Sequence, residues 1–205
     1  MAAPPPAAPT TARRRPRRGT PAATRARLIS AAAEVFNRVG YRGTDSNRLA
    51  RAAGYAPGTF YKHFPDKRAI FLAAYEAWVT AEWTAIERAL AQPAARTARA
   101  AALVDSIIAM HRRWRGLRAS LRALVAEDRA ARAFYRAQRR RQLEMLARLS
   151  APRHAPPTPR AAHAVLLYTI ERVSDAVADG ELRDVGVRVD DVLAMLRALI
   201  LAHIP

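Results

Sequence analysis

The sequence predicts an all-α protein of about nine helices. Along most of its 205 residues, apolar side chains recur at steps of three and four, as they do on one face of an α-helix. Alanine, leucine and arginine all favour helix and are abundant, whereas the chain has only 8 glycines and few β-branched residues, which argues against a large sheet. Because 51% of the residues are apolar, the chain can bury a sizeable core.

The composition also limits the kinds of partner and chemistry. Lysine and arginine total 35 against 17 acidic residues, a net charge of +18, so a polyanion is the natural partner. The absence of cysteine excludes disulfides, cysteine-ligated zinc and thiol catalysis, and it is compatible with a reducing cytoplasm. Arginines interrupt every apolar segment before it is long enough to span a membrane. We therefore expect a soluble, cytoplasmic protein with no membrane partner.

Residues 1–22 predict a disordered arm, because after Met1 they offer no large apolar side chain to bury. No apolar export segment follows the arm, so an export signal is not expected. Five arginines of the arm fall within six residues, and on a flexible segment they could contact DNA phosphates or a minor groove: Arg13, Arg14, Arg15, Arg17 and Arg18. The alternative is a tail that only keeps the chain soluble.

Residues 23–70 predict a small domain of three helices and the start of a fourth. Capping residues and glycines mark the expected bounds, which run from Thr24 to Gly40, from Thr44 to Gly54, from Pro57 to His63, and onward from Asp66. Residues 71–205 predict a second, all-helical domain. Its expected breaks lie at Gln92-Pro93, Trp114 to Gly116, Glu127-Asp128, Pro152 to Pro159, and Asp179 to Val189.

The second and third predicted helices have the proportions of a helix-turn-helix, with Gly54 and Tyr55 between them. At 100° per residue, Phe60 and Phe64 share an inward face while Gly58 and Lys62 point the other way. Thr59 and Tyr61 flank the outer face, so this surface suits contacts to the edge of a DNA groove and its phosphates. The alternative is an ordinary surface helix with two buried phenylalanines.

The segments Gly40 to Thr44 and Leu49 to Lys67 resemble the tetracycline-repressor (TetR) family. The most specific part is Gly-Thr-Phe-Tyr-x-His-Phe-x-x-Lys, which begins at Gly58 and has the Gly54 turn at the right distance upstream. The resemblance covers residues 24–72. It implies a homodimeric, ligand-responsive transcriptional regulator, usually a repressor of a palindromic DNA operator, with the carboxy-terminal helices forming a pocket and a dimer interface.

Carried over by position, the resemblance makes the third helix the recognition helix. The residues it implies at base edges or neighbouring phosphates are Thr44, Pro57, Gly58, Thr59, Tyr61, Lys62, His63 and Lys67. Arg48 is a further candidate at the groove wall, with a solvated helix face as the alternative. One departure is Ala56, which stands where the family commonly has a hydroxyl residue to cap the recognition helix.

The resemblance also implies an effector pocket for an apolar or aromatic small molecule in the second domain. Aromatic and polar residues at helical spacing supply its candidates, which are Tyr75, Trp78, Glu82, Met110, His111, Trp114, Tyr168 and Glu171. Core packing is the alternative for each of them. The fourth helix joins the DNA-binding unit to this region, so a ligand that tilts it would change the separation of two recognition helices.

The last two long helices have wide apolar faces that suggest a second chain. The residues predicted at the dimer interface are Leu166, Ile170, Val173, Val177, Leu196, Leu199 and Ile200. The alternative is packing within one chain.

Other functions find little support in the sequence. The chain has no phosphate-cradling glycine loop, no Gly-x-Ser-x-Gly and no His-Glu-x-x-His, so we expect no catalytic residues, no metal site and no cofactor. A DNA-binding protein that ignores sequence remains open, because the net charge alone would support it. A membrane-surface protein would need an amphipathic anchor beside the basic arm, which is lacking.

Overall fold

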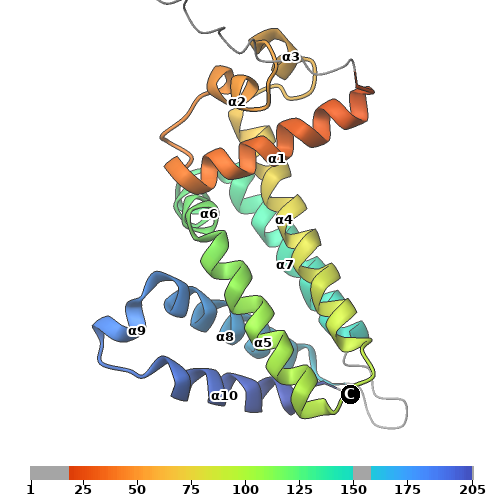
Figure 1. The fold of residues 1–205 in the computed structure, drawn as a ribbon, viewed down its shortest axis with the longest axis vertical. Coiled ribbons are helices and arrows are strands. Elements are labelled where there is room, and N and C mark those ends of the chain that lie inside the picture. The colour runs from red at the N-terminus through yellow and green to blue at the C-terminus, as the bar shows by residue number, and fades with distance from the viewer. Residues whose placement is uncertain (1–18, 150–157, 205) are drawn as a thin grey trace, which may run out of the picture.

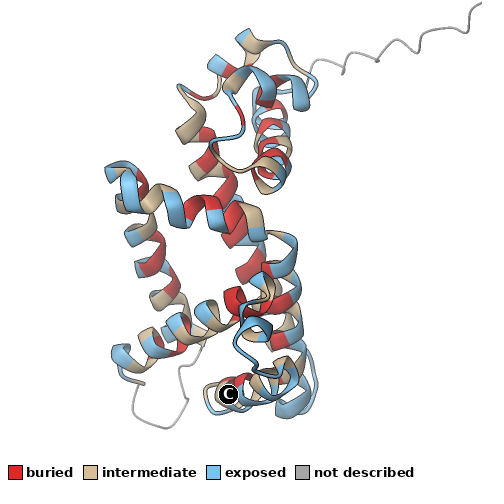
Figure 2. Cartoon of the chain, turned by 90° about the vertical axis from the view of Figure 1, so that its left-hand side faces the viewer, coloured by how far each residue is buried: buried red, intermediate tan, exposed pale blue. Residues whose placement is uncertain are grey.

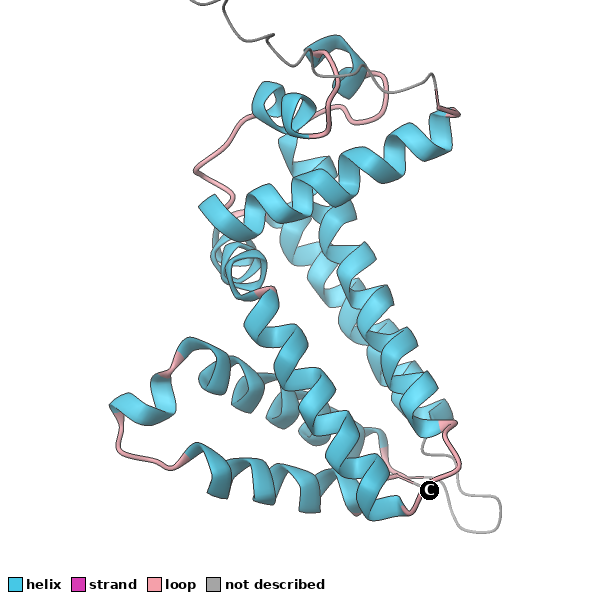
Figure 3. Cartoon of the chain, viewed as in Figure 1, coloured by secondary structure: helices cyan, strands magenta, loops and turns pink. Residues whose placement is uncertain are grey.

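The structure is a computed structural model that describes residues 19–149 and 158–204. These residues form ten α-helices and no strand, which confirms the all-α prediction (Figure 3). The predicted arginine arm, Arg13 to Arg18, lies outside the described residues. None of the helices in the described ranges is long and apolar enough to cross a membrane.

Three helices form the amino-terminal unit: α1 (Pro21–Val39), α2 (Ser46–Ala52) and α3 (Pro57–Tyr61). Helix α1 begins three residues earlier than expected, because the Thr20 side chain caps it by accepting a hydrogen bond from the Ala23 amide. The expected cap of α2 was wrong. Asp45 rather than Thr44 caps this helix, and its carboxylate accepts from the Arg48 amide at 2.8 Å.

Seven further helices make up the rest of the described chain. Their bounds are α4 (Lys67–Leu90), α5 (Arg96–Arg113), α6 (Arg115–Glu127), α7 (Arg129–Leu149), α8 (Arg160–Asp179), α9 (Glu181–Asp184) and α10 (Val189–Leu201). The breaks after α4, α5 and α6 fall where the sequence predicts them. The tenth helix arises because the four-residue α9 lies inside the expected break between residues 179 and 189.

The unit of α1, α2 and α3 lies at one end of the molecule, and α4 runs from it along the whole length of the second domain (Figure 1). Buried residues lie mainly on the inward faces of the long helices and exposed residues on their outer faces (Figure 2). One core cluster extends from α1 through α4 into α6, and a second joins α5, α8 and α10. Because α4 contributes to both parts of the protein, it couples them mechanically.

Helix α6 also packs against α1 and forms a second connection between the two parts. The Asn37 side chain donates to the Arg113 carbonyl at 2.7 Å and accepts from the Leu117 amide at 3.1 Å. The Ser120 hydroxyl accepts from the Tyr41 amide at 3.0 Å. These bonds satisfy free backbone groups at the end of α5 and the start of α6. The amino-terminal unit is therefore held at two places, along α4 and at the start of α6.

Candidate nucleic-acid interface and internal cavity

Helices α2 and α3 are joined by a tight turn at Gly54. Gly54 has a φ of 81°, in the left-handed region that favours glycine. Phe60 is fully buried and Phe64 is 3% exposed, which confirms the predicted inward face of this segment. The two rings anchor α3 to the core, so its opposite face is held outward in a fixed orientation.

The outer face of α3 is exposed. Tyr61 is 57% exposed, and Gly58 and Lys62 are also exposed. A Cβ added at Gly58 would meet nothing within 4 Å in the described part of the chain. The predicted DNA-contacting residues of this region also include Pro57, Thr59 and His63, and all three are half-buried. Pro57 and Thr59 lie on α3, and His63 follows it directly.

Two arginines of α1, which the sequence reasoning missed, support the turn from behind. Arg27 donates from Nε to the Ala53 carbonyl at 2.9 Å and lies over the Tyr55 ring. The Arg25 guanidinium lies 5.0 Å from the centre of the Phe64 ring. No sequence motif marked these residues, because their partners lie at least 26 positions away along the chain.

The structure places the three other predicted DNA-binding residues at the loop before α2. Thr44 is buried, and the Arg48 guanidinium donates to the Gly43 carbonyl at 3.1 Å. The Lys67 ammonium donates to the Tyr41 and Thr44 carbonyls at 3.0 and 2.9 Å. Lys67 thus holds this loop against α4. Its contact with a phosphate, like those of Thr44 and Arg48, stays a prediction.

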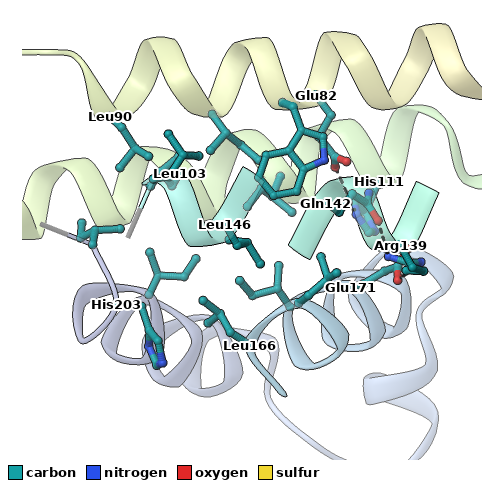
Figure 4. Close-up of a pocket in the computed structure, with 18 of the residues that line it drawn as sticks. Glu82, Leu90, Leu103, His111, Arg139, Gln142, Leu146, Leu166, Glu171 and His203 are labelled. Carbon is teal, nitrogen blue, oxygen red and sulfur yellow. Dashed lines mark hydrogen bonds and ion pairs between the residues drawn. The ribbon is translucent and has the colours of Figure 1, made fainter. Parts of the chain in front are cut away.

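A cavity of about 90 Å³ lies inside the second domain, between α4, α5, α6, α7, α8 and α10. Its two ends differ in polarity. Leu90 and Leu103 lie at one end with Leu146 and Leu166 nearer the middle, while the opposite end gathers the polar side chains Glu82, His111, Arg139, Gln142 and Glu171 (Figure 4). His203 is the one polar side chain labelled on the side of the leucines, and its Nδ1 lies 2.8 Å from the Leu199 carbonyl.

The polar end continues into a network of buried charges. Arg118, which is 4% exposed, donates from Nε to Asp175 at 2.7 Å and from Nη2 to Glu171 at 2.9 Å. Arg139 pairs with the same Glu171 from α7. Arg122 reaches Asp175 at 2.7 Å from the half-exposed side of α6. Charges buried in this way are costly unless they are paired, and here Glu171 and Asp175 each have at least two basic partners.

His111 lies at the centre of this network, on α5. Its Nδ1 is 3.0 Å from Asp175 and its Nε2 is 3.5 Å from Glu82, so it connects α8 with α4. Burial lowers the pKa of His111, but the hydrogen bonds with Asp175 and Glu82 more than offset it and the pKa is raised. Burial would raise the pKa of Asp175, yet hydrogen bonds from His111 and Arg118 hold it well below its usual range.

The cavity gathers some of the predicted pocket residues. Glu82, His111 and Glu171 line it. Trp78, Met110 and Trp114 pack in or against the first core cluster, and Tyr168 is 49% exposed, so their contact with a ligand stays a prediction. On α4 the cavity-lining residues begin at Glu82 and continue through Trp83 and Ile86 to Leu90.

Tyr75 lines a second, more polar hollow of about 210 Å³. This hollow lies on the other side of Arg118, Arg139 and Glu171, which it shares with the first cavity. Burial strongly raises the pKa of Tyr75. The predicted residue therefore lies next to the charged network, at a different opening from the apolar cavity.

The residues predicted at the dimer interface pack around the cavity and the second core cluster of the single chain, and their contact with a second chain stays a prediction. Leu166 and Ile170 line the cavity. The others belong to the second core cluster or pack against it, and these are Val173, Val177, Leu196, Leu199 and Ile200. Part of this apolar face packs against α5, and part of it lines the cavity. The large apolar side chains that α8 and α10 leave exposed are Val165, Tyr168 and Met195, at 65%, 49% and 74%.

The described helices also contain no group of three or more His, Cys, Asp or Glu residues arranged to hold a metal ion. The basic and carboxylate side chains around His111 pair with each other.

Helices α2 and α3, with the Gly54 turn between them, have the arrangement of a helix-turn-helix. Residues 28–74 match the family model described as bacterial regulatory proteins, tetR family. The match covers most of the amino-terminal unit and the start of α4. Among curated proteins, none matches the chain.

Solved structures share the fold over most of the chain. A regulator of the TetR family from Rhodococcus sp. is 17% identical, with a TM-score of 0.70 over 90% of this chain and 100% of that one. A regulator from Saccharomonospora viridis in complex with choline is 19% identical, with a TM-score of 0.66 over 89% and 98%. The regulator FadR from Bacillus subtilis in complex with stearoyl-CoA is 17% identical, with a TM-score of 0.58 over 88% and 99%.

Proposed function

We propose that this protein is a homodimeric transcriptional repressor that binds an inverted-repeat DNA operator and is released from it by a small, largely apolar ligand. In this proposal residues 23–70 bind the DNA, and residues 71–205 bind the ligand and the second subunit. The protein would act in the bacterial cytoplasm, where its DNA partner is located. The site would use no catalytic residue and no cofactor.

The observation that supports DNA reading most strongly is the outer face of α3. Gly58 allows close approach to a groove, and Lys62 and Tyr61 supply a cation and a phenol beside it. The pyrrolidine ring of Pro57 at the first turn fixes the helical φ, although Ala56 offers no side-chain cap. The net charge of +18 strengthens the attraction to the DNA backbone.

Selection from a random duplex library, at about physiological ionic strength, tests this part of the proposal. We expect an enriched inverted repeat, and we expect Lys62→Ala to relax the preference at one position of each half-site. The control is Arg148→Ala, which removes the same charge from an exposed position near the end of α7. Binding at low salt without enrichment would instead favour a sequence-indifferent DNA-binding protein, which the net charge also supports.

The dimer is proposed on the exposed face of α8 and α10, where Val165, Tyr168 and Met195 lie. Apolar side chains of this size gain from burial against a second copy, and two-fold symmetry matches an inverted repeat. Sedimentation equilibrium should give a mass of two chains of 22.6 kDa. Met195→Glu should shift it toward the monomer, while Ala102→Glu, an exposed site on α5, should not. A wild-type monomer would contradict the dimer.

The ligand response is proposed to pass through α4. This helix begins beside the DNA-binding unit at Lys67 and lines the cavity through Trp83, Ile86 and Leu90. The cavity of about 90 Å³ is smaller than the roughly 150 Å³ that accommodates benzene in a protein core. A ligand must therefore push the helices apart, and a shift of α4 changes the spacing of the two recognition helices. The similar structures in complex with choline and with stearoyl-CoA support a small-molecule ligand.

A further inference from the structure

The proposed function requires only a small, largely apolar ligand, and the polarity of the cavity's two ends restricts the chemistry of that ligand further. This inference rests on the proposed function. Leu90 and Leu103 mark the apolar end, and Arg139 and His111 mark the polar end (Figure 4). A ligand that fills the cavity lengthwise must therefore be amphipathic, with one polar end. The remaining question is which polar group the wall requires.

Two hydrogen-bond donors of the cavity wall have no acceptor among the described residues. These are the indole Nε1 of Trp83, which is 5% exposed, and the Nε of Arg139, which is 7% exposed. Both residues line the cavity. A buried donor left without an acceptor costs about 1–3 kcal/mol, so a group that supplies acceptors here gains more than its own contact.

Several acceptors of the same wall are already in use. Both oxygens of Glu171 are engaged, one by Arg118 and one by Arg139. The side-chain oxygen of Gln142 accepts from Arg139 at 2.9 Å, and one oxygen of Glu82 lies 3.5 Å from His111. A carboxylate entering the cavity would supply acceptors to the two unpaired donors, which an ammonium group cannot do.

We infer that the effector is an amphipathic carboxylate, whose apolar body lies among the leucines of the cavity and whose carboxylate accepts hydrogen bonds from Trp83 and Arg139. Arg139 then binds the carboxylate of the ligand as well as Glu171. Because Trp83 lies on α4 and Arg139 on α7, the carboxylate bridges the helix that leads to the DNA-binding unit and its neighbour.

Three probes with the same ten-carbon chain test the inference on the full-length protein: decanoate, its methyl ester and decylammonium. Isothermal titration calorimetry should rank decanoate first, the ester second and decylammonium last, with decanoate at least about tenfold tighter than decylammonium. Trp83→Phe keeps an aromatic ring and removes the donor, so it should weaken decanoate about tenfold and leave decylammonium unchanged.

A second variant and a matched control guard against misfolding. Arg139→Lys keeps the positive charge beside Glu171 but removes the Nε donor, and it should weaken decanoate in the same way. Arg140→Lys makes the same change at the next residue, which is exposed and does not line the cavity, and should have no effect. Circular dichroism then confirms that all three variants are folded.

The possible failures are distinguishable. If decylammonium binds as tightly as decanoate, or if Trp83→Phe leaves the affinity for decanoate unchanged, the carboxylate inference is wrong while the apolar effector cavity stands. If none of the three probes binds, both the inference and the proposed effector cavity are wrong. DNA reading by α3 is tested separately by the library selection and is affected by neither result.

Discussion

The start of α6 meets the last turn of α1 at Gly116 and Asn37, where a Cβ on residue 116 would lie 1.9 Å from the Asn37 carbonyl oxygen. A glycine is therefore required for this close approach of two backbones. The contact lies directly beside the hydrogen bonds of the Asn37 side chain to α5 and α6. It fixes where the DNA-binding unit sits on the second domain.

Gly116→Ala should destabilise this junction, because the methyl group cannot fit without separating α1 from α6. We expect the free energy of unfolding to fall by about 1–3 kcal/mol in urea denaturation. Gly58→Ala is the control for stability, because a Cβ there meets nothing within 4 Å in the described chain. Equal stability of the Gly116→Ala variant and wild type would contradict the tight junction.

Gly58→Ala tests whether the outer face of α3 contacts DNA, because this change should not destabilise the free protein. Alanine favours helix over glycine by about 1 kcal/mol, so the stability should be equal or higher. If α3 enters a groove at this face, the added methyl group should weaken operator binding by about tenfold or more. Fluorescence anisotropy with the selected operator measures it. An unchanged Kd would show that residue 58 does not approach the DNA closely.

His111 should make the stability of the protein depend on pH. Its pKa is raised on folding, so its contribution is fully present below the unfolded pKa of about 6.5 and is lost as the pH rises through the folded pKa. Urea unfolding of wild type and His111→Gln from about pH 5.5 to about pH 8.5 isolates this contribution. The difference in stability between them should shrink as the pH rises. A difference that grows with pH would mean that His111 is buried uncharged.

Arg118 and Arg122 both reach Asp175 from α6, one turn apart, and differ in burial. Their side chains are 5% and 48% exposed. Arg118→Met should cost about 3–5 kcal/mol, because it leaves Asp175 and Glu171 buried with fewer partners. Arg122→Met removes an ion pair that water already screens and should cost less than about 1 kcal/mol. Thermal or urea unfolding compares them, and similar losses would show that burial does not set the strength of these pairs.

The sequence by itself determined the local features of the amino-terminal unit. The glycine turn at residue 54, the inward phenylalanines at 60 and 64 and the cap at Asp66 each depend on residues a few positions apart. Short-range steric and hydrogen-bonding rules are enough to predict such features. The same rules placed the helix breaks at residues 92, 114 and 127.

Only the tertiary structure decided which helix faces and which distant side chains of the second domain meet. Arg118 is 57 residues from Asp175 and His111 is 64 residues from it, and no local pattern brings such residues together. On α4 the cavity is lined by Trp83, which the sequence did not single out, and on α8 and α10 the apolar faces pack against the chain's own core. Helical periodicity shows that a face is apolar, but which neighbour buries that face is set by how the helices pack.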